Sequence, residues 1–322
     1  MYSRLSFSNP CLVLLSLCLL ASTTGAKPVD KELADSNGIG PVIANLRILA
    51  SQGDAMAEYR LGRLYLSGTG VPSDYAEAAK YFGLAAAQGL IEAEMVLGYL
   101  YEQGKGVPRD DRRAFEYYSA AAKQGDVTAA NNLAVMYENG RGVHKDVRQA
   151  VDWYRRAAEG GNVVAQCNLG TMYFRGRGVA RDYTQAAGWF MKASESDYAP
   201  GQQLLAWMYF KGKGVTQDYT MTVHWLGLAA QSDARAQMDL GSLYEQGKGV
   251  PLDYVTAYMW YKTAESGGEP RAPQKLKALS KLMTKEQISR AEMSFQDLSI
   301  ATDTRAALER TQRAGNSIRA KR

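Results

Sequence analysis

The sequence predicts an all-α protein, a solenoid of six helix-turn-helix repeats of about 36 residues with degenerate helical caps at both ends. Two observations predict this fold. The short element Gly-x-Gly-Val recurs in steps of 36, 36, 36, 36 and 35 residues. Upstream of each copy, apolar residues follow the spacing of one helix face, as in Ala57, Leu61 and Tyr65. A fixed period of this length is the signature of stacked supersecondary units.

Composition excludes several other classes of protein. Of the 322 residues, 46% are hydrophobic and 22% are charged, which is the balance of a soluble domain and not of a disordered or multi-span membrane chain. The net charge of +5 is too small for a dedicated nucleic-acid binder. Two histidines and three cysteines leave little material for zinc sites, disulfide frameworks or Cys/His nucleophiles.

Residues 1–26 have the pattern of a secretory signal peptide. Arg4 supplies a positive charge, an apolar stretch runs from Cys11 to Ala21, and small residues lead to Ala26. We expect cleavage after Ala26 and export to the periplasm or out of the cell; the alternative is a leader retained as a membrane anchor. Cleavage would leave Cys167 as the remaining cysteine, which we interpret as a half-buried structural thiol.

The repeat sets the expected domain boundaries. We expect an N-terminal helical cap over residues 27–50, six repeats over 51–268, capping helices over 269–299 and a basic, frayed tail over 300–322. Thr284 and Gln287 form a capping box for the last helix. Such end pieces are needed because the terminal repeats of a solenoid otherwise expose an apolar face.

Each repeat carries a glycine pair suited to the end of its first helix, where the backbone must enter the left-handed region. The first glycines are Gly68, Gly104, Gly140, Gly176, Gly212 and Gly247. The second glycines are Gly70, Gly106, Gly142, Gly178, Gly214 and Gly249.

An aspartate after each glycine pair is placed to accept hydrogen bonds from the free amides that open a second helix. These residues are Asp74, Asp110, Asp146, Asp182, Asp218 and Asp253. Glu77, Gln149 and Gln185 extend the cap to a capping box in three repeats.

The two helices of a repeat also show how they pack. The small residue after each repeat leucine, such as Gly62, lets another helix approach closely. On the second helix, Ala78, Tyr81 and Ala85 follow the spacing of a buried stripe. One such pair cannot bury its stripes alone, so neighbouring pairs must stack.

The repeated pattern Ala-x-x-x-Leu-Gly-x-x-Tyr, Gly-x-Gly-Val-x-x-Asp, Ala-x-x-Trp-Tyr and Ala-Ala-x-x-Gly resembles the Sel1-like repeat family, a relative of the tetratricopeptide repeats. The resemblance covers residues 51–268. It implies a right-handed superhelix that serves as an adaptor in protein complexes. Exported bacterial members of that family look like regulators, envelope assembly factors or proteins that meet host cells.

The sequence gives no support for chemistry, and we expect no catalytic residue, cofactor or metal. The third glycine of a nucleotide-binding Gly-x-Gly-x-x-Gly is missing in every copy, and each element follows a helix instead of a strand. His144 and His224 lack the spacing of a zinc protease site, and we interpret both as solvated.

The middle residue of the glycine element is cationic in five copies. These residues are Lys105, Arg141, Arg177, Lys213 and Lys248. Stacking in register would line them along one edge, where they could attract an acidic partner or an anionic surface. The other interpretation is a consensus that keeps the loops soluble.

Partner binding is expected on the inner face lined by the first helices, at positions that vary between copies while the framework does not. Aromatic residues there would supply the strongest contacts. The candidates are Met95, Tyr99, Asn131, Asn132, Asn168, Thr171, Phe174, Trp207 and Phe210. Ordinary packing between repeats is the competing interpretation of each position.

These observations favour an exported, non-enzymatic scaffold that binds a protein or peptide, without nucleic acid and without a stable membrane span after leader cleavage. One alternative is a cell-wall-active or β-lactamase-like enzyme. Another is a binder of anionic envelope surfaces through the cationic loops.

Overall fold

The computed structural model describes residues 39–299, which form helices and no strand. The chain divides into two compact units, of which the first ends at Ala180 and the second begins at Arg181. The helices of the first unit are α1 (Ile39–Ser51), α2 (Ala55–Ser67), α3 (Tyr75–Ala87), α4 (Ile91–Gln103), α5 (Asp111–Lys123), α6 (Val127–Asn139), α7 (Val147–Glu159) and α8 (Val163–Arg175). The predicted all-α fold of helix pairs is confirmed.

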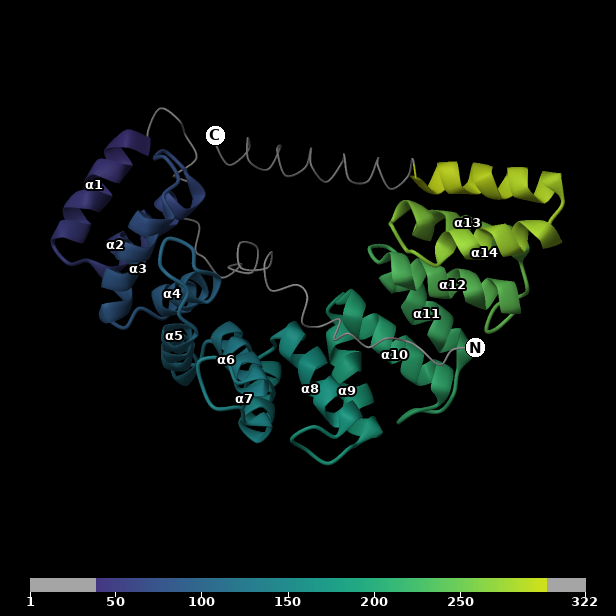
Figure 1. The fold of residues 1–322 in the computed structure, drawn as a ribbon, viewed down its shortest axis with the longest axis horizontal. Coiled ribbons are helices and arrows are strands. Elements are labelled where there is room, and N and C mark those ends of the chain that lie inside the picture. The colour runs from purple at the N-terminus through teal and green to yellow at the C-terminus, as the bar shows by residue number, and fades with distance from the viewer. Residues whose placement is uncertain (1–38, 300–322) are drawn as a thin grey trace. The chain divides into compact units, whose positions relative to one another are not determined.

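The second unit continues the same alternation of helices (Figure 1). Its elements are α9 (Tyr183–Glu195), α10 (Ala199–Lys211), α11 (Tyr219–Ala229), α12 (Ala234–Gln246), α13 (Tyr254–Ser266), α14 (Ala272–Leu279), the 3-10 turn η2 (Ser280–Leu282) and a helix over 285–299. Within each unit a helix contacts the helix before it and the helix after it in sequence. The core is therefore a row of small interfaces and not one central cluster.

Both positions of the glycine pair require glycine for structural reasons, and the pair after α6 is an example. Gly140 ends the helix in the left-handed region at φ 72° and donates its amide to the Met136 carbonyl. Gly142 also has positive φ, and a Cβ placed on it would collide with the backbone carbonyl of Asp111, the first residue of α5. The second glycine therefore lets each loop lie directly on the preceding repeat.

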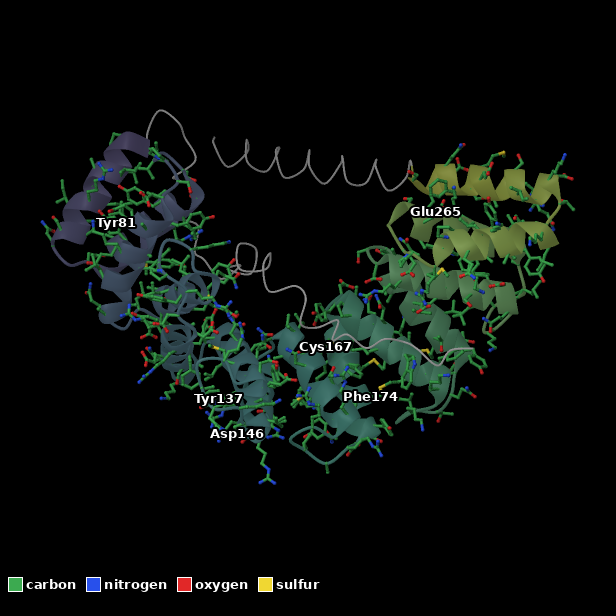
Figure 2. All side chains as sticks on the ribbon, in the orientation of Figure 1. Tyr81, Tyr137, Asp146, Cys167, Phe174 and Glu265 are labelled. Atoms are coloured by element: carbon green, nitrogen blue, oxygen red, sulfur yellow. The ribbon has the colours of Figure 1, made fainter. Side chains whose placement is uncertain are left out.

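The six aspartates act as N-caps, as predicted. Asp146 accepts hydrogen bonds from the amides of Arg148 and Gln149 at 2.9 and 3.1 Å. The predicted capping box is only half formed, because the Asp146 amide donates to the Tyr137 carbonyl at 3.0 Å and not to the side chain of Gln149. The tyrosine carbonyl at the end of one helix thus fixes the start of the next. Tyr137 and Asp146 are labelled in Figure 2.

The small residue after the repeat leucine does allow close approach. A Cβ on Gly62 would come within 2.8 Å of the Phe82 ring. This ring corrects the predicted stripe on the second helix. Ala78 and Ala85 are fully buried, but the buried aromatic between them is Phe82 and not Tyr81. Tyr81 is half-buried and stacks on Tyr65, with ring centroids 5.7 Å apart.

Helices at both ends cover the terminal repeats. In the first unit, Ile43 and Leu46 of α1 pack with Leu61 of α2. In the second unit, Thr284 and Gln287 form the predicted capping box, with hydrogen bonds of 2.9 and 3.1 Å in the two directions. The expected leader at 1–26, the first residues of the expected cap and the tail at 300–322 lie outside the described residues.

Candidate partner-binding surface

The predicted binding residues separate into two groups by burial. Five are half-buried on the first helices of their pairs: Tyr99, Thr171, Phe174, Trp207 and Phe210. Four are buried: Met95, Asn131, Asn132 and Asn168. Figure 2 labels Phe174 at the end of α8. Only the first group presents side-chain surface that a partner could contact without displacing the packing between helices.

The three asparagines are tied to one another across two repeats. Asn168 of α8 donates its amide to the Asn131 side-chain oxygen at 3.1 Å, and Asn131 of α6 donates to Asn132 at 3.4 Å. Between 3% and 4% of each residue is exposed. Their burial agrees with the competing interpretation of these three candidates, packing between repeats. The hydrogen bond between Asn131 and Asn168 joins α6 to α8, and it gives two buried amide groups a partner.

Tyr99 is connected to the loop that follows its helix. Its hydroxyl accepts a hydrogen bond from the Lys105 ammonium group at 3.3 Å, and the same ammonium group lies 5.4 Å from the centre of its ring. Lys105 also lies 5.8 Å from the ring of Tyr75 on the preceding repeat. The half-buried tyrosine is thus held in place by a loop cation instead of moving freely.

Two of the predicted loop cations form structural ion pairs with a buried carboxylate of the preceding repeat. Arg141, in the loop after α6, donates to Glu102 Oε1 at 2.5 Å. The other carboxylate oxygen accepts a hydrogen bond from the Tyr118 hydroxyl at 2.8 Å. Only 6% of the Glu102 side chain is exposed. The carboxylate therefore joins α4 and α5 to the next loop in one buried contact.

The same arrangement recurs one repeat later. Glu138 accepts from the Tyr154 hydroxyl and from Arg177, each at 2.8 Å. Burial raises the pKa of both phenols, Tyr118 and Tyr154, well above the ordinary value, and the neighbouring carboxylate adds to the effect. The phenols therefore remain proton donors at all physiological pH values.

A sequence rule underlies these contacts, and sequence reasoning missed it. Where the second helix has Tyr118, Tyr154 or Tyr261, the residue sixteen positions earlier is Glu102, Glu138 or Glu245. Where the ring position holds Phe82, Phe190 or Leu226, the earlier residue is Leu66, Phe174 or Phe210. The signal was visible in the aligned repeats, because carboxylate and hydroxyl appear together and disappear together. Phe174 and Phe210, predicted as binding residues, occupy the apolar version of this position.

Loop cations without a carboxylate lie over aromatic rings. In the second unit, the Lys213 ammonium group is 5.5 Å from the centre of the Tyr183 ring. Lys248 lies 5.3 Å from the Phe210 ring and 5.8 Å from the Tyr219 ring. The predicted row of loop cations is therefore not uniform. Its arginines are neutralised by buried glutamates, whereas its lysines lie over aromatic rings.

The residues considered for chemistry have ordinary surroundings. His144 and His224 are exposed, as expected. Cys167 is fully buried, which corrects the expectation of a half-buried position; the other two cysteines lie outside the described residues. Over residues 39–299, no group of three or more His, Cys, Asp or Glu side chains could hold a metal ion. Within the same range, no helix combines the length and apolar character needed to cross a bilayer.

Comparison with known proteins identifies the repeat. The Sel1 repeat model matches six consecutive segments, 55–90, 91–126, 127–162, 163–198, 199–233 and 234–269. None of the curated proteins compared with the chain matches it.

Among solved structures, a Sel1 repeat protein from Oxalobacter formigenes is 28% identical, with a TM-score of 0.61 over 67% of this chain and 86% of that chain. A protective antigen of uropathogenic Escherichia coli with an SLR fold is 26% identical, with a TM-score of 0.46 over 85% of this chain and 82% of that chain. An immunity protein from Pseudomonas aeruginosa is 21% identical, with a TM-score of 0.40 over 66% of this chain and 80% of that chain. Because the family model matches six segments that together span more than half of the chain, the chain belongs to the Sel1 repeat family.

Proposed function

We propose that this protein is an exported, non-enzymatic scaffold that holds a protein or peptide partner on the face formed by its first helices. Sel1 repeats form a scaffold fold typical of protein–protein interaction, and proteins built from them are generally non-enzymatic. Export and the choice of the first-helix face for binding are part of the proposal and do not follow from the family.

The observation that carries the proposal is the difference between the framework and the variable positions of each first helix. The repeat leucines Leu61, Leu97 and Leu133 are buried. All six copies of the repeat have leucine at this position. Two positions after the leucine, Tyr99 and Trp207 are half-buried aromatics in a slot that changes from copy to copy. Large half-buried aromatic side chains supply much of the affinity of protein interfaces.

Export is supported by the sequence alone. The apolar stretch from Cys11 to Ala21, followed by small residues up to Ala26, has the length and flanks of a cleaved leader. Terminal sequencing of the protein isolated from its source should give Lys27 as the first residue. A mature chain that keeps Met1, or is found inside the cell, would remove this part of the proposal.

The binding face is tested by affinity capture with two aromatic variants, one for each unit. Tyr99→Ser and Trp207→Ala should each reduce recovery of the partner from an extract of the source organism. Matched controls are Leu84→Ala on α3 and Met293→Ala near the end of the described chain, at 46% and 57% exposure. Equal recovery with all four variants would rule out the first-helix face.

An enzymatic function is the competing outcome. Purified protein that hydrolyses peptidoglycan or a β-lactam, with an activity that follows the protein through purification, would replace the scaffold proposal.

A further inference from the structure

In the second unit, two loops and the helix ends beside them carry a cluster of cations and aromatic rings, which we call the cation–aromatic edge. It consists of Tyr183, Phe210, Lys211, Lys213, Tyr219 and Lys248. Phe210 and Tyr219 lie against each other with ring centroids 5.4 Å apart. Lys211 lies 5.0 Å from the Phe210 ring, on which Lys248 also converges. The edge thus spans the loops after α10 and α12, two successive repeats.

The charge of this edge is not balanced by ion pairs. Among residues 39–299, no carboxylate lies within ion-pair distance of Lys211, Lys213 or Lys248. Two equivalent cations of the first unit, Arg141 and Arg177, are bound to buried glutamates, whereas the third, Lys105, lies over the rings of Tyr75 and Tyr99. One repeat before Lys213 and Lys248, the glutamate position holds Phe174 and Phe210. The change from glutamate to phenylalanine therefore leaves the loop cations available for another anion.

The rings determine which kind of anion fits. An ammonium group over a ring is attracted to its face and loses part of its rotational freedom before any ligand arrives. The same contact occupies ring faces that sugars or nucleic-acid bases would need for stacking. What remains accessible is a row of positioned charges, one or two for each repeat, and this suits carboxylates spaced along an extended chain.

An apolar side chain lies on the same loop as Lys248. Leu252 is 57% exposed, one of the most exposed large apolar residues within 39–299. It gives a bound chain a place for an apolar side chain beside its acidic groups.

We propose that the cation–aromatic edge binds an extended acidic peptide segment that carries leucine or a similar apolar residue, supplied by a partner protein. This goes beyond the proposed function, because the edge lies on loops and helix ends, whereas the scaffold proposal rests on Tyr99 and Trp207. Loss of either interaction leaves the other measurable.

The test uses the mature protein and a fluorescent peptide of four Asp-Glu-Leu triplets, with an Asn-Gln-Leu peptide of the same length as the uncharged control. The acidic peptide should bind and the control should not, and binding should weaken as salt is raised. Replacing Lys213 and Lys248 together by Gln should weaken binding about tenfold, since two charge contacts are removed.

A matched variant separates the edge from net charge. Lys277→Gln with Lys281→Gln removes the same charge from two exposed residues of α14 and η2, and it should leave the affinity within about twofold of the original. Equal weakening by both pairs would overturn the proposal, as would unchanged binding in the edge variant. Vesicles of phosphatidylglycerol provide the last comparison. Vesicle binding that depends on Lys213 and Lys248, with no peptide binding, would also overturn it in favour of a membrane surface.

Discussion

Two equivalent contact sites between neighbouring repeats, which we call joints, use opposite chemistry. One joint is formed by α4, α5 and the loop after α6, and the other by α10, α11 and the loop after α12. In the first, Glu102 receives hydrogen bonds from Tyr118 and Arg141 in a buried contact. In the second, Phe210 replaces the glutamate, and Lys248 lies over its ring.

This comparison shows that the repeat needs a matched set at each joint and not one particular residue. A buried carboxylate is tolerated when a phenol and a guanidinium satisfy it, because an unpaired buried charge is costly. An apolar pair needs neither partner. The loop cation is structural in the first case and accessible to solvent and ligands in the second.

The largest expected effect comes from mixing the two chemistries. Glu102→Leu leaves the fully buried Tyr118 hydroxyl without its acceptor and Arg141 without its carboxylate, and should destabilise the first unit by about 3 kcal/mol. Urea denaturation followed by circular dichroism measures the loss. Adding Tyr118→Phe should restore most of it, because the first repeat already pairs Leu66 with Phe82. A double variant as unstable as the single one would break the rule.

The next effect compares the two kinds of loop cation directly. Arg141→Met leaves a buried carboxylate with only one partner and should cost about 1 to 2 kcal/mol, discounted for the partial exposure of the arginine. Lys248→Met removes a cation that lies over rings and should change stability by less than about 0.5 kcal/mol. Similar losses in both variants would show that the two joints do not differ in the way described.

A third comparison concerns a carboxylate of the second unit that is poorly paired. Burial raises the pKa of Asp239 to about 6, and Arg271, 3.8 Å away, offsets only part of this because it also binds Glu269 at 2.6 Å. Glu269 and Asp233 raise the pKa further, whereas Arg235 lowers it.

The folded protein therefore holds this proton more tightly than the unfolded chain, so stability should fall as the pH rises from about 4 to about 6. Asp239→Asn removes the dependence and should gain about 1 to 2 kcal/mol at neutral pH. Unfolding curves of both proteins at several pH values check the sign. Parallel curves would contradict it.

The last comparison concerns the turns that connect one helix pair to the next. In the first unit, Gly89 and Gly161 take positive φ after their second helices, at 80° and 89°. In the second unit Asp197 takes this place at φ 55°, the one non-glycine residue with positive φ within 39–299. Asp197→Gly should raise stability by about 1 kcal/mol by relieving backbone strain. A loss of stability would indicate that the aspartate side chain compensates for the strain.

Much of the fold could be predicted from the sequence because its determinants are local and repeated six times. The cap at Asp146 and the close approach at Gly62 each depend on one position of a helix, so their spacing reveals them. The position of the buried ring was predicted one residue too early, at Tyr81 instead of Phe82. Spacings of three and four residues both fit a helix face, and only packing decides between them.

The candidate site was harder to predict because its contacts join different repeats. Arg141 is 39 residues from Glu102, and each residue alone looks like a solvated charge. Asn131 and Asn168 were candidates for partner binding, but in the folded protein their side chains are buried and hydrogen-bond to each other. A sequence shows that a polar residue lies on a helix face, whereas the neighbouring repeat decides whether that face meets solvent, a partner or another helix.

One experiment tests directly whether the arginines and the lysines of these loops have different roles. The paired variants Arg141→Gln with Arg177→Gln and Lys213→Gln with Lys248→Gln are each measured for unfolding free energy and for binding of the Asp-Glu-Leu peptide. We predict a crossed result, in which the arginine pair loses stability but keeps its affinity, and the lysine pair keeps its stability but loses affinity. If one pair controls both quantities, or if the two pairs behave alike, the division between structural and binding cations is wrong.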